Sequence, residues 1–271
     1  MPELPEVETE RGRLAGRLEG HRIAAARIDD PRLTRPEEPA WIAARLAGER
    51  VDSVERRGKY LVVRLGESDG DSQSQVLLVH LRMTGGFRFE PATHERAVLE
   101  LVDGTRIAYR DLRRFGTWLL LEPDDAEAHL ATRLGPEPLG RRFTTAFLAE
   151  RLSGRRAPIK AAILDQRTVA GLGNIYADES LWHARIHPLR PAGGLSGEEV
   201  ERLREGIRRA LRLGIRRQGA DLGDGAYADG RMQHEFRVYG RVGEQCDRCG
   251  TPIEKTRAGG RGTWYCPGCQ S

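Results

Sequence analysis

Four cysteines near the end of the chain form the sharpest chemical pattern in the sequence. Cys246 and Cys249 make one Cys-x2-Cys pair, and Cys266 and Cys269 make a second. Two such pairs can surround one tetrahedral zinc ion with four thiolates. Disulfides are the weaker interpretation, because the chain has no other cysteines and no sign of export. We expect one zinc ion with a structural role, since four thiolates leave no coordination position for water.

The opening residues, MPELPEVETE, suggest a nucleophile. A small proline at position 2 favours removal of Met1, which would expose a secondary amine able to form an iminium with a sugar aldehyde. An α-amine, with a pKa of about 7.7 to 8.0, is neutral at pH 7 far more often than a lysine at about 10.4. Glu3 beside it could act as a proton donor. A plain helix start is the alternative interpretation, but it explains Pro5 and Glu6 and gives no reason for Pro2.

Lysine is rare in this chain, because only Lys59, Lys160 and Lys255 occur among 44 basic residues. A compact amine that can lose its proton is a possible reason for keeping a lysine at 59 and at 160. An ordinary surface cation fits these positions equally well from the sequence alone.

The segment VAGLGNIYADE places Gly171 and Gly173 directly before Asn174, where a helix is expected to begin. The N–H groups at a helix N-terminus can hold a phosphate. Glycines between helices are more often simple turns, and both interpretations stay open at this point.

The elements that must position these residues fall into two kinds. After a first helix over 5–20, alternating apolar residues and the hairpin turn VDGT predict an antiparallel β-sandwich. Its strands are expected at 22–28, 50–57, 59–66, 75–83, 85–90, 96–110 and 116–122. From about residue 124 the pattern becomes helical, with helices expected over 143–154, 159–166, 174–186 and 195–219.

The last of these helices has a well-specified start. Ser196 and Glu199 have the spacing of a capping box, and Leu195 with Val200 can form a hydrophobic staple. A buried stripe should follow along the helix, formed by Val200, Leu203, Ile207, Leu211 and Ile215. The glycine-rich segment 219–230 is expected to be a mobile loop.

Composition is that of a globular protein with a sizeable core. The 271 residues are 39% hydrophobic and 31% charged, with a net charge of +4 and a sequence pI near 9.0. No apolar run reaches membrane-spanning length, and the acidic start is unlike a signal peptide. We expect a cytoplasmic protein, and the total charge alone is weak evidence for a polyanionic partner.

Taken together, the motifs resemble the bacterial formamidopyrimidine-DNA glycosylases. The resemblance rests on PELPEVET, RRGKYL, HLRMTG, DLRRFG, GLGNIYADE, VYGR and the four-cysteine finger, which occur in this order along the whole chain. It implies an α+β multidomain fold, with an N-terminal antiparallel β-sandwich and flanking helices, a helical helix-two-turns-helix domain and a C-terminal β-hairpin zinc finger. Its domains would span 1–133, a linker at 134–142, 143–234 with a lesion-capping loop, and 235–271.

The resemblance also implies a base-excision repair enzyme, a DNA glycosylase and abasic-site lyase that acts on damaged double-stranded DNA as a monomer in the bacterial cytoplasm and nucleoid. Such an enzyme removes oxidised purines and cleaves by β,δ-elimination through a Schiff base with the N-terminal proline, the DNA lying across a cleft between the two halves. Two alternatives stay open: an endonuclease VIII-like specificity for oxidised pyrimidines, and a catalytically silent DNA-binding paralogue. A start of Pro-Glu-Leu-Pro disfavours the first, and intact Pro2 and Glu3 disfavour the second.

The site residues follow from the resemblance position by position. Catalytic roles are implied for Pro2, Glu3, Lys59 and the finger-tip residue Arg261. DNA-binding roles are implied for His94, Arg113, Arg156, Lys160 and Asn174, and a void-filling role for Met83, Arg113 and Phe115. Read without the resemblance, these are ordinary surface charges, a loop histidine, a helix cap and two core residues.

One stretch departs from the family pattern. Residues 219–234, which would close over the damaged base, are shorter and richer in glycine and aspartate than is usual in the family. Lesion preference, and 8-oxoguanine in particular, is the property that this departure would affect.

Overall fold

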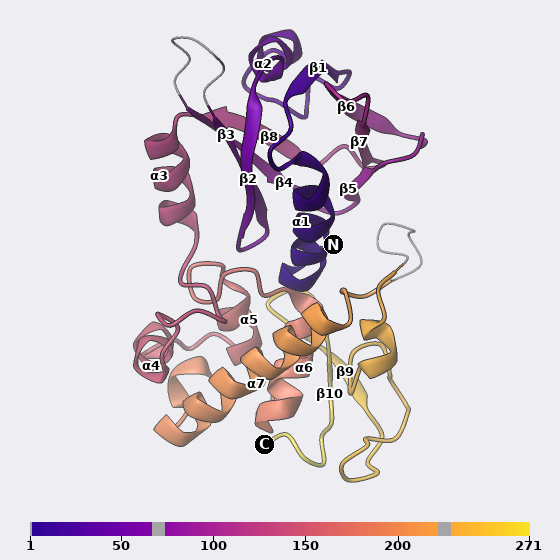
Figure 1. The fold of residues 1–271 in the computed structure, drawn as a ribbon. Helices are drawn as coiled ribbons and strands as arrows, with labels where there is room; N and C mark the ends of the chain where they lie inside the picture. The colour runs from indigo at the N-terminus through magenta and orange to yellow at the C-terminus, as the bar shows by residue number, and fades with distance from the viewer. Residues whose placement is uncertain (1, 67–73, 222–228) are drawn as a thin grey trace. The chain divides into compact units, whose positions relative to one another are not determined.

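The computed structural model describes residues 2–66, 74–221 and 229–271. These residues form two compact units (Figure 1). Of the described residues, the first unit contains Pro2 and residues 6–132 without 67–73, and the second contains residues 3–5, 133–221 and 229–271, which include the zinc-finger segment.

The first unit is built on two antiparallel four-stranded sheets. One has the strand order β1-β6-β7-β5, and the other has the order β2-β3-β4-β8. The strands are β1 (Ile23–Ile28), β2 (Arg50–Arg57), β3 (Tyr60–Gly66), β4 (Gln75–His80), β5 (Gly85–Arg88), β6 (Glu95–Leu101), β7 (Arg106–Asp111) and β8 (Thr117–Leu121). A single core contains apolar side chains from both sheets, with the ring of Trp118 against Phe87 and Tyr109. The predicted sandwich is confirmed, as is the hairpin at VDGT, where Gly104 has a φ of 84°.

Three helices accompany the sandwich: α1 (Leu4–Leu18), α2 (Pro39–Leu46) and α3 (Pro123–Arg133). The sequence pattern predicted only strands in the region that contains α2, so this helix was not expected. Pro39 stands in its first turn, and Ile42 and Leu46 are buried one turn apart. This spacing was the available signal, although eight residues give a weak helical period.

The second unit is mainly helical and ends in a two-stranded hairpin. Its elements are α4 (Thr145–Leu152), α5 (Ile159–Leu164), α6 (Asn174–Ala184), α7 (Gly197–Arg216), the short 3₁₀ turns Ala192–Gly194 and Met232–Glu235, and the strands β9 (Glu254–Ala258) and β10 (Arg261–Tyr265). Most of α6 is buried, and it packs against α7, α5 and β10. It is therefore the central helix of this unit (Figure 1).

The start of α7 confirms the predicted capping box. The Ser196 hydroxyl accepts a hydrogen bond from the Glu199 amide at 3.3 Å, and the Ser196 amide donates to the Glu199 carboxylate at 2.8 Å. Four of the five residues of the predicted stripe are buried, and Ile215 is partly buried near the helix end.

Most of the predicted loop over 219–230 lies outside the described residues, because 222–228 are not described. None of the helices in the described ranges is both long and apolar enough to cross a membrane.

Candidate active site and zinc centre

Glu3 is held at the N-terminus of α6. Its side chain is 2% exposed, and its two carboxylate oxygens accept hydrogen bonds from the amides of Ile175 (2.9 Å) and Tyr176 (3.3 Å). These N–H groups have no partner within the helix, and together with the positive end of the helix dipole they stabilise a carboxylate. The sequence had suggested a phosphate at this helix N-terminus. In the structure, the Glu3 carboxylate of the same unit accepts hydrogen bonds from its amides instead.

The two glycines before α6 make room for this arrangement. A Cβ at Gly173 would lie 2.3 Å from the carboxyl carbon of Glu3. Gly171 has a φ of 81°, and its carbonyl accepts a hydrogen bond from the Leu4 amide at 3.0 Å. The sequence left the role of these two glycines open. In the structure, their lack of a side chain lets the segment 3–5 lie against the start of α6.

Pro2 directly precedes Glu3 in the chain and is buried. Lys59 is 7% exposed and follows Gly58, whose φ of 60° belongs to the tight turn that joins β2 to β3. Burial, with the positive charges of Arg82 and Lys59, lowers the pKa of His80 to about 3. Lys59 is therefore close enough to His80 to oppose a positive charge on its imidazole.

Two loops of the first unit are joined through the Thr84 hydroxyl. It donates to the Asp111 carboxylate at 2.5 Å and accepts from the Arg113 amide at 3.0 Å. Asp111 also accepts from the Gly116 amide at 2.8 Å, which closes the loop 112–115 into a defined turn. The turn containing Met83 and the loop containing Arg113 are therefore held together at one edge of the sandwich.

The side chains on this loop project into solvent. Phe115 is 51% exposed, and the guanidinium of Arg113 lies over its ring at 4.8 Å. His94 is exposed, and its carbonyl accepts a hydrogen bond from the Asp111 amide at 3.1 Å. The structure thus brings Met83, Arg113, Phe115 and His94 into one neighbourhood, while their roles toward DNA stay predictions.

Arg114 lies between these exposed residues but turns to the protein. It has a φ of 58° and forms a bidentate ion pair with Asp30 at 2.6 and 2.8 Å. This pair lowers the pKa of Asp30 and anchors the loop to the segment after β1.

Lys160 is fully buried in the second unit, where the sequence analysis expected a DNA-binding lysine. Its ammonium is paired with Asp178 at 2.8 Å and donates to the Gly262 carbonyl at 2.8 Å and to the Thr263 hydroxyl at 3.0 Å. Burial lowers the pKa of Lys160, and Asp178 opposes that change. Burial likewise raises the pKa of Asp178 to about 7, opposed by Lys160.

Three further predicted site residues also lie in the second unit: Arg156 and Asn174, expected to bind DNA, and Arg261, expected to have a catalytic role. Arg156 is exposed just before α5, and Arg261 is exposed at the start of β10. Asn174, the first residue of α6, donates its amide N–H to the Gly262 carbonyl at 3.1 Å. Asn174 and Arg261 are therefore connected through the hairpin tip.

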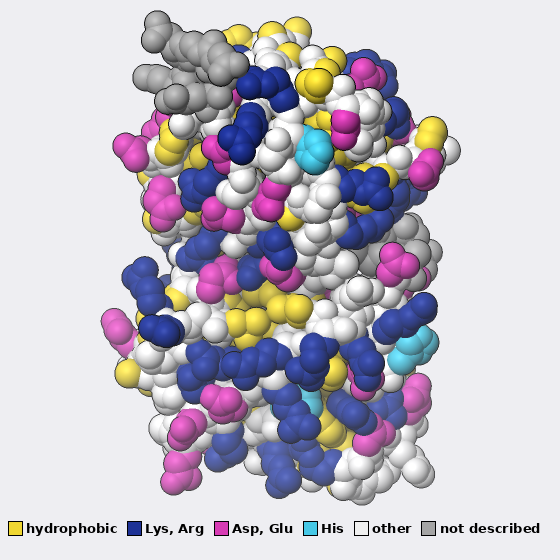
Figure 2. Space-filling model, in the orientation of Figure 1, with side chains coloured by type: hydrophobic (Ala, Val, Ile, Leu, Met, Phe, Trp, Pro, Cys, Tyr) yellow, Lys and Arg dark blue, Asp and Glu magenta, His cyan; other side chains and the backbone are white. Residues whose placement is uncertain are grey.

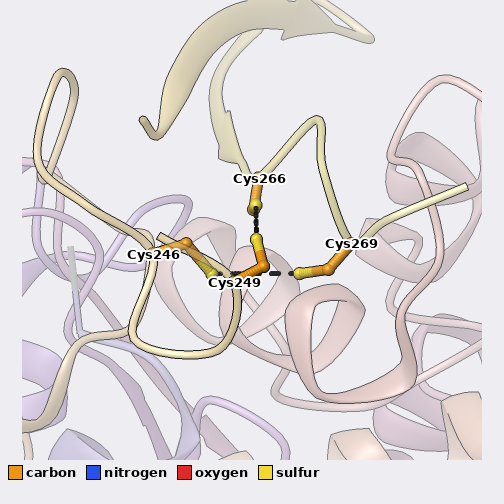
Figure 3. Close-up of side chains that lie close together, drawn as sticks. All are labelled: Cys246, Cys249, Cys266 and Cys269. Carbon is orange, nitrogen blue, oxygen red and sulfur yellow. Dashed lines mark hydrogen bonds between the residues drawn. The ribbon is translucent and has the colours of Figure 1, made fainter. Parts of the chain in front are cut away.

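The four cysteines lie together as predicted (Figure 3), with all four sulfur atoms within 4.8 Å of one another. Cys246 and Cys269 are 3.8 Å apart, and Cys249 and Cys266 are 3.4 Å apart. Ligands at the usual Zn–S distance of about 2.3 Å, in a tetrahedron, would be about 3.8 Å apart. The four thiolates fit one zinc ion, which they would fully coordinate.

The surroundings of the cysteines suit a negatively charged zinc–thiolate centre. The indole N–H of Trp182, on α6, points to the Cys246 sulfur at 3.4 Å, and the Arg248 guanidinium points to the Cys269 sulfur at 3.5 Å. Arg248 also stacks over the Trp182 ring at 3.9 Å. These donors connect the metal centre to α6.

The residues that hold these side chains in place were not among those that the sequence predicted. Glu179 is buried and accepts hydrogen bonds from the amides of residues 237–239. Asp178, Thr263, Thr84 and Asp111 act in a similar way at the contacts described above. The neighbouring acids Asp178 and Glu179 were a signal in the sequence, because acids in a buried helix need hydrogen-bond or ion-pair partners. Their partners are distant in the sequence and could not be inferred from it.

Comparison with known protein families matches nearly the whole chain. Residues 1–118 match the formamidopyrimidine-DNA glycosylase N-terminal domain, 134–224 the formamidopyrimidine-DNA glycosylase H2TH domain, and 243–271 a zinc finger found in FPG and IleRS. The chain is 48% identical to the formamidopyrimidine-DNA glycosylase of Symbiobacterium thermophilum, covering 100% of this chain and 89% of the relative. It is 43% identical to that of Deinococcus radiodurans, covering 100% and 97%.

Solved structures agree. The Fpg of Lactococcus lactis in complex with abasic-site DNA has a TM-score of 0.89 at 36% identity, covering 99% of both chains. The Fpg of Thermus thermophilus has a TM-score of 0.87 at 41% identity, covering 99% of this chain and 98% of the other. The motifs, the fold, the cysteine cluster and these relatives agree, and the chain belongs to the formamidopyrimidine-DNA glycosylase family.

Proposed function

We propose that this chain excises oxidised purines, formamidopyrimidines above all, from duplex DNA and then cleaves the resulting abasic site. The observation that carries the proposal is the Glu3 carboxylate, held by two backbone amides next to Pro2. Relatives support the substrate class, because solved Lactococcus lactis complexes contain Fapy-dG DNA and abasic-site DNA. Another contains an oxidised pyrimidine, so pyrimidine lesions are a second candidate substrate.

Pro2 is the nucleophile in this proposal, with its amine exposed by removal of Met1. Its nitrogen attacks the sugar C1′ and loses its N–H proton, while the bond between C1′ and the base breaks. The base leaves with the electron pair and takes up that proton. Ring opening then gives an iminium between C1′ and the Pro2 nitrogen, and O4′ takes up a proton. Glu3 donates and accepts protons at the sugar ring, where its fixed position favours rapid transfer.

The iminium makes the remaining steps possible by acting as an electron sink. Loss of a proton from C2′ expels the 3′-phosphate (β-elimination), and loss of a proton from C4′ expels the 5′-phosphate (δ-elimination). Water then hydrolyses the iminium and regenerates the amine. Lys59 is the proposed acid or base of these eliminations, and Arg261 the proposed partner of the phosphate in the last one.

DNA is proposed to be held through its phosphates and read at the lesion. Arg156, Asn174 and His94 are the proposed phosphate ligands, and Met83, Arg113 and Phe115 are proposed to fill the space left by the everted nucleotide. Positive side chains also gather over α7 (Figure 2), where Arg209, Arg212 and Arg216 are exposed. Such a surface attracts a polyanion at long range. We propose that the protein acts as a monomer on the DNA of the bacterial cytoplasm.

Borohydride trapping tests the function directly. Native protein should give a covalent adduct with lesion-containing duplex DNA that maps to residue 2, because an iminium is reduced to a stable amine. A variant with extra uncleaved residues before Pro2 should keep its zinc and its DNA affinity but lose trapping and excision. An adduct at Lys59, or excision at the native rate by the extended variant, would contradict the proposal. Zinc-dependent DNA binding without any excision would identify a silent paralogue.

A further inference from the structure

The ammonium of Lys160 is surrounded by acceptors that belong to the protein itself. Its ammonium has three donors, and three acceptors lie within 3.0 Å of it: the Asp178 carboxylate, the Gly262 carbonyl and the Thr263 hydroxyl. Lys160 and Asp178 are both 0% exposed at their side chains. A phosphate could reach this ammonium only after the hairpin had moved.

The acceptors of Lys160 on the hairpin lie next to Arg261 in the chain or bond to its backbone. The Thr263 hydroxyl, which accepts from Lys160, donates in turn to the carbonyl of Arg261 at 3.0 Å. Gly262, the neighbour of Arg261, receives hydrogen bonds from both Lys160 and Asn174. Two consecutive backbone carbonyls, those of Arg261 and Gly262, are therefore held from within the unit, while the Arg261 side chain is exposed.

The turn that precedes Arg261 is seated on the same helix as Lys160. Gly259 has a φ of 55°, and a Cβ there would lie 2.8 Å from the Cβ of Ala161, the residue after Lys160. The turn thus approaches α5 closely. This packing and the hydrogen bonds of Lys160 hold the hairpin tip at two adjacent points.

Asp178 connects the hairpin to the helix that holds Glu3. One carboxylate oxygen pairs with Lys160, and the other accepts from the Trp264 amide at 3.2 Å. Asp178 lies one turn along α6 from Ile175, whose amide donates to Glu3. Since an α-helix has a fixed rise per residue, α6 sets the spacing between the Glu3 carboxylate and the hairpin that presents Arg261.

We propose that Lys160 and Asp178 are positioning residues that fix Arg261 of the zinc-finger hairpin relative to Glu3, and that Lys160 does not contact DNA. The proposal rests on the proposed role of Arg261 at the phosphate of the last elimination. It explains why a buried ion pair stands at this position. Such a pair stabilises a protein no more than apolar residues would, but it is costly to break and it fixes the geometry of the groups around it.

A double-mutant cycle between Lys160 and Arg261 tests this assignment. On abasic-site DNA, Lys160→Met should slow the δ-elimination about 10- to 100-fold and let the β-product accumulate, as Arg261→Ala should, because misplacement of a group by about 1 Å can cost that much. When Arg261 is already alanine, Lys160→Met should cost less than about 3-fold, since there is no side chain left to misplace. Equal losses in both backgrounds would overturn the proposal.

Two further variants separate positioning from folding. Thr263→Val leaves the buried ion pair intact but removes the link to the Arg261 carbonyl, so it should reproduce the δ-elimination defect in milder form, about 5-fold. Lys255→Met is the matched control, because Lys255 lies on the same hairpin, is exposed and stacks on Trp264 at 4.8 Å. It should leave the product ratio unchanged. Zinc content should be one per chain in every variant.

Hydrogen exchange of the amides of residues 261–264 gives a readout that is independent of activity. Lys160→Met and Thr263→Val should both speed exchange there, whereas unchanged exchange in both would overturn the proposal. If Arg261→Ala alone left the δ-elimination intact, the proposed role of Arg261 would fail. Faster exchange in the Lys160 and Thr263 variants would still show that these residues fix the hairpin.

Discussion

The carboxylate of Glu3 accepts a hydrogen bond from the backbone N–H of Ile175 at 2.9 Å, across 172 positions of the chain. The donor belongs to the backbone, so no substitution at 175 other than proline removes it. The helix N-terminus thus supplies a permanent and rigid partner for the acid next to Pro2. A substitution can instead fill the space at Gly173 that lets Glu3 reach the Ile175 amide.

Gly173→Ala tests that space. Its Cβ would come within 2.3 Å of the Glu3 carboxyl carbon, so Glu3 must leave the helix N-terminus. We expect base excision to slow on the order of 100-fold, because displacement of a catalytic group by about 1 Å has that effect. Gly197→Ala is the control, since a Cβ there meets nothing within 4 Å. Single-turnover excision measures both variants, and similar rates for the two would refute the positional argument.

Sequence reasoning placed most elements of both units but could not place the contacts between distant segments. The sandwich and α7 were predictable, because alternation and the capping box are local signals. The use of the GLG turn was not, because it depends on Glu3, far away in the chain. Lys160 was predicted by resemblance to bind DNA, and only the coordinates reveal that its ammonium faces Asp178 and the hairpin.

Glu10 gives a prediction about stability and pH. It is fully buried on α1, and burial raises its pKa to about 7, against the opposing effects of Arg13 and Arg88. An acid whose pKa is higher in the folded state costs nothing at low pH, and its cost develops as the pH rises from about 4.5 to about 7. Glu10→Gln removes this cost while keeping the shape of the side chain.

We therefore expect the free energy of unfolding of Glu10→Gln, relative to the native chain, to increase by about 2 to 3 kcal/mol between pH 4 and pH 8. Urea unfolding at a series of pH values measures it. Glu205→Gln is the control, because Glu205 is exposed on α7. If the difference between Glu10→Gln and the native chain were the same at both pH values, the buried acid would not have a raised pKa.

Trp182 should control how firmly zinc is held. Trp182→Phe removes the indole N–H that points to the Cys246 sulfur at 3.4 Å but keeps a ring beneath Arg248. Loss of such a second-sphere donor weakens metal binding by roughly 10- to 100-fold. Zinc transfer to a colorimetric chelator measures the change. The control is Trp264→Phe, because among the described residues no hydrogen bond joins the Trp264 indole to a cysteine sulfur. It should transfer zinc at the native rate, and equal rates for both variants would exclude a role for the Trp182 N–H.

Thr84 should determine how well the loop 112–115 is held. Its hydroxyl links the turn of Met83 to both Asp111 and Arg113. Thr84→Val keeps the shape but removes both hydrogen bonds, each worth about 1 kcal/mol. If Arg113 reads the base opposite the lesion, a looser loop should reduce discrimination between opposing bases by about 5-fold, with little change in the rate on the preferred pair.

Thr132→Val is the matched control for Thr84→Val, because the Thr132 hydroxyl donates to the carbonyls of Ala128 and His129 in its own helix. Excision from duplexes that differ only in the opposing base measures both variants, and Arg113→Ala gives the limit in which the reading side chain is absent. The loss in Thr84→Val should lie between the native enzyme and that limit, because the guanidinium is still present but held less firmly. A uniform loss on every opposing base would instead indicate that Thr84 supports the sandwich as a whole, and that the loop does not carry the discrimination.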